Sequence, residues 1–228
     1  MDALGDERAQ RPAVSADSAT GVTAARTRER LDYGGARCGR CGSLCPGRLG
    51  GDDYQTAARP AAAACGSDYW PLKTLSDPQR KLVNLTPKDT TLTAIAQLPH
   101  PRPTPTTRNT PFERQVWRVT AQITEFKGEG DGDIHLILFD AGVYGIAEMP
   151  AVSCLPKKAR DRKAIVNVRK RFVTACGKAT GSWKQLGAVV KISGLGLWDK
   201  PHTQNPHAPN FAELHPVTGL KLLAGCGT

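Results

Sequence analysis

Residues 116–140 decide the fold, and they read VWRVTAQITEFKGEGDGDIHLILFD. Apolar and polar side chains alternate over 116–126, which is typical of a half-buried strand. The next seven residues contain three glycines and predict a turn. A second strand is predicted over 134–140. Its alternate side chains would face the core and the outside, with His135 on the outer face.

The rest of the C-terminal half extends this pattern. YGIAEMP (144–150) predicts a third strand, and apolar side chains at helical spacing predict a helix over 157–177. Two more strands are expected over 187–198 and 212–223. Strand-strand-strand-helix-strand-strand is the order of the OB-fold. The sequence therefore predicts a mainly β domain over 112–228, a small OB-like five-stranded barrel with one helix between strands 3 and 4.

The N-terminal half has a different composition. Residues 1–64 are rich in Ala, Arg and Gly without lasting periodicity, and we interpret them as a disordered tail. Residues 65–111 are interpreted as an extended arm and a Pro-rich connector. Thiolates of Cys38, Cys41 and Cys45, with Cys65 as a fourth ligand, could bind zinc. The alternative is that these cysteines are scattered through a Gly/Arg-rich tail.

Charge and apolar runs limit the classes of function. The 228 residues carry a formal net charge of +10, which favours nucleic acid or another polyanion as a partner. No run of 18 apolar residues exists, so no transmembrane segment is predicted. The first residues contain no apolar core of a signal peptide, although the small residues before Cys65 resemble the end of one.

A ligand site is expected at one rim of the predicted barrel. OB-folds bind ligands on strands 2 and 3, between the loops that join strands 1–2 and strands 4–5. Here these two loops are the most polar loops of the domain, and aromatic side chains on the strands could stack on bases. The candidate ligand-binding residues are Asp131, Asp133, His135, Phe139, Tyr144, Asp199 and Asn210.

The same rim offers ligands for a metal. Carboxylate oxygen and imidazole nitrogen suit zinc, manganese or iron, so a divalent metal is a candidate cofactor. The candidate metal ligands are His135, His202, Glu213 and His215. Together with Asp133 they could instead hold a water for general-base hydrolysis. The structural alternative is that Asp and Asn order the loops, while Glu213 and His215 pair with neighbouring strands.

The predicted helix is strongly basic. It could follow a phosphate backbone, or it could be a solvated helix face. Its basic residues are Lys157, Lys158, Arg160, Arg162, Lys163, Arg169, Lys170 and Arg171.

Three stretches resemble a widespread family of uncharacterised bacterial proteins. They are YWPLKTLSD (69–77), DGDIHLILFD (131–140) followed by IAEMP, and GLGLWDKPHTQNPHAPNFAELHPV (194–217). The resemblance implies an extracytoplasmic location, where Cys154 and Cys176 could be oxidised, and it implies no activity. This chain departs from the family at 205–207, where a Gly-rich turn is more usual, and in lacking a leader.

Three hypotheses follow. The first is an OB-like binding module for nucleic acid or another polyanion. The second is a metal-assisted, nuclease-like hydrolase that uses the Asp, His and Glu side chains of the rim. The third is a secreted structural domain.

Overall fold

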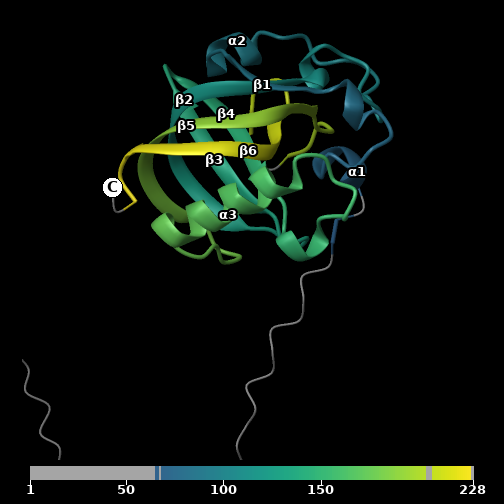
Figure 1. Ribbon diagram of the computed structural model, residues 1–228. Helices are drawn as coiled ribbons and strands as arrows, with labels where there is room; N and C mark the ends of the chain where they lie inside the picture. The colour runs from purple at the N-terminus through teal and green to yellow at the C-terminus, as the bar shows by residue number, and fades with distance from the viewer. Residues whose placement is uncertain (1–64, 67, 204–206, 227–228) are drawn as a thin grey trace, which may run out of the picture. The chain divides into compact units, whose positions relative to one another are not determined.

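The computed structural model describes residues 65–66, 68–203 and 207–226 (Figure 1). The tail predicted over 1–64, with Cys38, Cys41 and Cys45, lies outside the described residues. The described part is mainly β sheet, with six strands and few helices.

Five strands occupy the five stretches where apolar side chains alternate in the sequence. They are β2 (Gln115–Gly128), β3 (Ile134–Asp140), β4 (Val143–Met149), β5 (Lys184–Trp198) and β6 (Ala212–Ala224). The sixth strand, β1 (Asn84–Asp89), lies in the stretch that was interpreted only as an extended arm, and it pairs in parallel with the start of β2. It is mostly exposed and contains Pro87, so it has none of the burial pattern that reveals a strand.

Five of the strands pair in a closed order that begins and ends with β2. β2 pairs with β3, β3 with β4, β4 with β6, β6 with β5, and β5 again with β2. All these pairs are antiparallel except β4–β6, which is parallel. The main core lies on the side of the sheet that faces α3, and its fully buried members include Ile123, Leu136, Leu138, Ile192 and Phe172.

The longest helix begins later than predicted. Helix α3 spans Arg162–Cys176, not 157–177. Its preceding residue, Asp161, has a φ of 56°, a left-handed conformation that interrupts a helix. Lys157, Lys158 and Arg160 therefore precede α3 in a turn. The helix packs against β6 (Figure 1), and the ring of Phe172 contacts that of Phe126 at 5.1 Å between centroids.

The segment over 65–111 contains two short α-helices and a 3₁₀-helix, η1 (Arg80–Leu82), besides β1. The α-helices are α1 (Trp70–Lys73) and α2 (Leu92–Ala96). Arg108 is fully buried, and its guanidinium donates to Asp77 Oδ2 at 2.9 and 3.0 Å and to the Leu72 carbonyl at 2.9 Å. This buried cation ties the Pro-rich stretch to α1.

Two disulfides join distant parts of the chain, Cys65–Cys154 and Cys176–Cys226. Since Cys65 is bonded to Cys154, it offers no thiolate to a zinc ion in this state. The helices described here are all too short or too polar to cross a membrane.

Candidate metal centre

A polar cluster lies on the face of β3, β4 and β6 that is turned away from the main core. Leu136, Ala147 and Leu214 belong to the core, so their neighbours in sequence point to the opposite face. There the structure places His135, Glu148, Glu213 and His215, and Asp133 precedes β3. All five are at most 5% exposed, so this face is buried although it is turned away from the main core.

His215 stands at the centre of the cluster. Its Nε2 lies 3.3 Å from Asp133 Oδ2, and its Nδ1 lies 2.9 Å from Glu148 Oε2 and 3.5 Å from Glu213 Oε2. Both nitrogens of one imidazole thus face carboxylates.

Glu148 connects the two histidines. Its Oε1 accepts a hydrogen bond of 2.5 Å from His135 Nδ1, while its Oε2 faces His215. The pairing of β4 with β3 sets Glu148 opposite His135, and its pairing with β6 brings Glu148 beside Glu213 and His215.

Several atoms of this cluster have unmet bonding capacity. Within the described part of the chain, buried atoms without a hydrogen-bond partner include Asp133 Oδ2, Glu213 Oε2, His135 Nε2 and both ring nitrogens of His215. Buried polar atoms are nearly always bonded, because an unpaired one costs about 1–3 kcal/mol. Those of His215 and Asp133 are ion-paired without a hydrogen bond of normal geometry, so they could bind a further group such as a cation.

The charges shift the proton affinities of the cluster. Burial alone would lower the pKa of His215, but the charge of Glu148 and the other carboxylates raises this pKa well above its usual value. Burial would also lower the pKa of His135, but its hydrogen bond to Glu148 raises this pKa above its usual value. Burial would raise the pKa of Glu148, but His215 and His135 lower it well below its usual value. Burial and then Glu148 raise the pKa of Glu213 to about 7.

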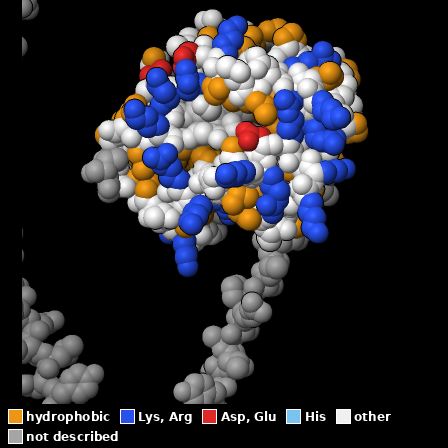
Figure 2. Space-filling view, viewed as in Figure 1, with side chains coloured by type: hydrophobic (Ala, Val, Ile, Leu, Met, Phe, Trp, Pro, Cys, Tyr) orange, Lys and Arg blue, Asp and Glu red, His pale blue; other side chains and the backbone are white. Residues whose placement is uncertain are grey.

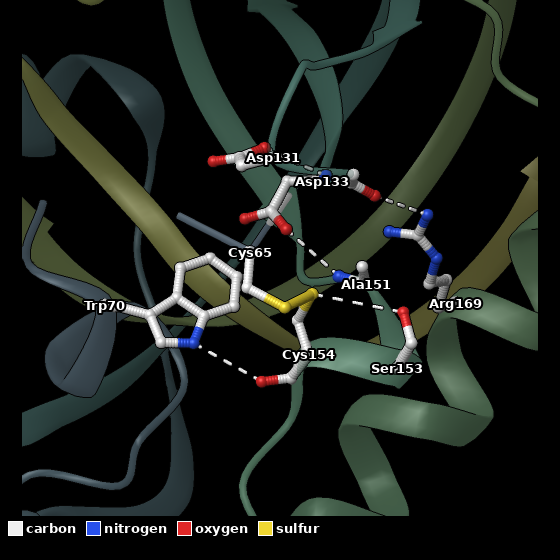
Figure 3. The surroundings of a disulfide bond; sticks show 9 residues. Cys65, Trp70, Asp131, Asp133, Ala151, Ser153, Cys154 and Arg169 are labelled. Carbon is white, nitrogen blue, oxygen red and sulfur yellow. Dashed lines mark hydrogen bonds between the residues drawn. A yellow bond between two sulfur atoms is a disulfide. The ribbon is translucent and has the colours of Figure 1, made fainter. Parts of the chain in front are cut away.

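Backbone contacts hold Asp133 in place (Figure 3). Its Oδ1 accepts from the Ala151 N–H at 3.0 Å, which leaves Oδ2 directed to His215. Asp131 Oδ1 accepts from the Asp133 N–H at 3.0 Å, and Arg169 donates to the carbonyls of Gly132 at 2.7 Å and of Met149. Cys154, three residues after Ala151 in the sequence, forms the disulfide with Cys65. Asp131 is therefore a support for Asp133, not a member of the cluster.

The structure brings some predicted residues together and separates others. Asp199 and His202 lie beside Glu213, with His202 Nε2 3.4 Å from Asp199 Oδ2. The rings of Phe139 and Tyr144 contact each other at a tilt of 50°, with 5.0 Å between centroids, at the end of the β3–β4 hairpin far from His135. Asn210 donates 2.9 Å hydrogen bonds to the carbonyls of Ile95 and Leu98, so it orders a loop.

Sequence reasoning missed Glu148. Its signal was present, because a carboxylate interrupts the apolar run IAEMP on the same alternation as Tyr144 and Ile146. We interpreted that run only as a strand. The partner strands of β4, which decide what Glu148 meets, follow from the pairing and not from the local pattern.

The basic residues of the predicted helix divide into two groups. Arg160 donates to the carbonyls of Arg80 at 2.7 Å and Val83 at 2.8 Å, and Arg171 donates to Leu220 at 3.2 Å. With Arg169, these arginines bond to backbone carbonyls, although Arg171 is itself exposed. The other five basic residues are also exposed, namely Lys157, Lys158, Arg162, Lys163 and Lys170. Figure 2 shows many basic and few acidic side chains on this face.

The donor set fits a divalent metal. One ligand atom each from Asp133, Glu148 and His215 can be chosen within 4.8 Å of one another. The sets Glu129–His135–Glu148 and Asp199–His202–Glu213 meet the same criterion. Two carboxylates and an imidazole suit zinc, manganese or iron.

No protein-family model matches the chain, and no curated protein matches it. A solved structure of a "putative aspartyl-tRNA synthetase" from Leishmania major Friedlin is similar at 12% identity and a TM-score of 0.35. The similarity covers 63% of this chain and 22% of that chain, so this chain spans about a fifth of the other's length. A likeness this small assigns neither fold nor function.

Proposed function

We propose that the chain is an OB-like five-stranded barrel that binds a divalent metal and hydrolyses phosphodiesters with it. The pairing order β2-β3-β4-β6-β5-β2, with α3 between the third and fourth strands of the barrel in chain order, supports the OB-like barrel. The strand β1 would then be an addition outside the barrel.

The observation that carries the proposal is the convergence of Asp133, Glu148 and His215 with orphaned, buried ligand atoms. Buried carboxylates are costly unless a cation pairs with them. A proton on His215 offsets part of that cost, and a divalent ion offsets more. A bound ion would supply Lewis acidity and would lower the pKa of a coordinated water.

We infer that Glu213 acts as the general base. Its carboxylate lies 3.5 Å from His215 Nδ1, at the edge of the proposed ligand set. In the metal-free chain, burial and then Glu148 raise the pKa of Glu213 to about 7, and a bound cation would lower this pKa and keep the carboxylate ionised and able to accept a proton.

The surroundings favour an anionic substrate with an aromatic part. Lys73 Nζ lies 4.0 Å from Glu148 Oε2 and Lys127 Nζ lies 3.2 Å from Glu129 Oε1. Lys127 also lies 4.7 Å above the half-buried ring of Trp183, which contacts His135. A cation beside an aromatic ring is the arrangement that binds phosphate and stacks a base. The two disulfides support an oxidising, extracytoplasmic location.

The test compares the full-length chain with three variants. After metal loading and dialysis, the wild type is expected to retain zinc or manganese and to cleave single-stranded DNA or a nitrophenyl phosphodiester. His215→Gln should lose the metal and the cleavage. Glu213→Gln should keep the metal while cleavage falls on the order of 10²- to 10⁴-fold. His100→Gln, whose ring contacts Trp198 outside the cluster, should match the wild type.

The outcomes separate the hypotheses. A wild type that retains no metal contradicts the proposal. Retained metal with salt-sensitive DNA binding but no cleavage would favour the binding module. Thermal denaturation of each variant shows whether a loss of metal merely reflects unfolding.

A further inference from the structure

Glu148 presents its two carboxylate oxygens to two different histidines. Oε1 lies 2.5 Å from His135 Nδ1, and Oε2 lies 2.9 Å from His215 Nδ1. β4 lies between β3 and β6, so one residue of β4 reaches a histidine on each neighbouring strand. A carboxylate used in this way can bridge two metal ions, one on each oxygen.

Each side of Glu148 has its own further carboxylate. On the His215 side it is Asp133, on the loop before β3. On the His135 side it is Glu129, whose Oε1 lies 3.6 Å from His135 Nδ1. The chain therefore offers two sets of one imidazole and one carboxylate, and both sets share Glu148.

The atoms without a hydrogen bond add an independent observation at His215. Asp133 Oδ2 and both nitrogens of His215 make ion pairs but form no hydrogen bond of normal geometry in the described residues. Both imidazoles are at most 4% exposed, so solvent does not satisfy these atoms. A single ion at His215 would leave uncoordinated two carboxylate oxygens beside His135 Nδ1, namely Glu148 Oε1 and Glu129 Oε1, the second of which is paired with Lys127 Nζ at 3.2 Å.

We propose that the site is dinuclear, with Glu148 bridging one divalent ion held by Asp133 and His215 and a second held by Glu129 and His135. This inference rests on the proposed metal binding and adds its stoichiometry and geometry. Paired ions in hydrolases stand about 3.5–4 Å apart and stabilise the attacking and leaving oxygens of a phosphodiester together. The mononuclear ligand set described above then becomes one half of the site.

The test is a titration of the metal-free, full-length chain with Mn²⁺, followed by electron paramagnetic resonance. The wild type is expected to bind two ions per chain and to show the exchange-coupled signal of a manganese pair. His135→Gln should bind one ion with an uncoupled signal. Glu129→Gln, a change at a partly exposed loop residue that spares the sheet, should weaken the second ion on the order of ten- to a hundredfold. Glu125→Gln removes a β2 carboxylate bonded to Gln185, and it should still bind two.

Each other outcome overturns a defined part. One ion in the wild type overturns the dinuclear site and leaves the proposed metal binding intact. No ion overturns both. Two ions that persist in both His135→Gln and Glu129→Gln, with the coupled signal unchanged, show that the second ion lies elsewhere.

Discussion

His215 shows how one buried residue can set the chemistry of a site. Its imidazole is fully buried and faces three carboxylates, so the metal-free protein must hold protons there to limit repulsion. A metal and these protons compete for the same atoms, and metal affinity should therefore rise with pH.

The protons also make stability depend on pH. The pKa of Glu213 is raised by burial and Glu148 to about 7, against an ordinary value of 4.5, so the folded state holds this proton more tightly than the unfolded state. Burial would lower the pKa of His215, but Glu148 raises it above the ordinary value of 6.5. Above pH 6.5 the folded state therefore holds this proton more tightly than the unfolded state, and stability again falls as pH rises. The free energy of unfolding of the metal-free chain should thus fall by about 1–3 kcal/mol from pH 5 to pH 7.

Urea denaturation across this range measures the effect. Glu213→Gln should flatten the profile, whereas Glu125→Gln should not change it. Below pH 4.5 the sign reverses, because His215 and His135 overcome burial and depress the pKa of Glu148, and its stabilising charge is lost as pH falls. A profile that is equally steep in Glu213→Gln would refute the role given to this carboxylate.

At the scale of elements, β5 approaches the turn over Phe112–Arg114 very closely. A Cβ added to Gly196 would lie 2.3 Å from the Phe112 carbonyl oxygen and 2.9 Å from its carbon. The backbone at Phe112 is also held by Trp117, whose Nε1 donates to the same oxygen at 2.9 Å. Gly196→Ala should therefore destabilise the fold by about 1–3 kcal/mol.

A matched change tests that the cause is contact and not the loss of a glycine. Gly181 lies in a loop, and a Cβ added to it would meet no atom of the described residues beyond its chain neighbours within 4 Å. Gly181→Ala should therefore be neutral or slightly stabilising. Thermal denaturation of both variants measures the difference in stability. Equal melting temperatures would contradict the prediction and would mean that β5 and the turn can move apart with little loss of stability.

The elements also show how far the sequence predicts the structure. Alternation located β2 to β6, because a strand with one buried face must repeat every two residues. It did not find β1, since an exposed edge strand needs no such repeat. Polarity picked out Asp133, His135, Glu213 and His215, but not Glu148, because its role comes from the strands on either side of it. The predicted start of α3 was wrong because the run of charged residues begins before Asp161, whose left-handed backbone conformation delays the helix to Arg162.

At the scale of the whole domain, the two disulfides have different neighbours. Cys154 lies three residues after Ala151, whose N–H donates to Asp133 Oδ1. The carbonyl of Cys154 accepts a hydrogen bond from Trp70 Nε1 at 3.3 Å (Figure 3). Its bond to Cys65 thus fixes α1 beside the loop that aims Asp133. Cys176 ends α3 and Cys226 follows β6, on the side of the domain away from α1 (Figure 1).

Removing each disulfide separates stability from metal binding. The Cys65–Cys154 bond spans 89 residues and the Cys176–Cys226 bond 50, so the paired Ser variants should each lose about 2–5 kcal/mol of stability. Only Cys65→Ser/Cys154→Ser should also weaken Mn²⁺ binding, on the order of tenfold or more, because Asp133 loses the support of a fixed Ala151. Calorimetric titration well below both melting temperatures measures the affinities. Equal affinity in the two variants would show that Asp133 is positioned without the disulfide, by Arg169 and the Asp131 turn alone.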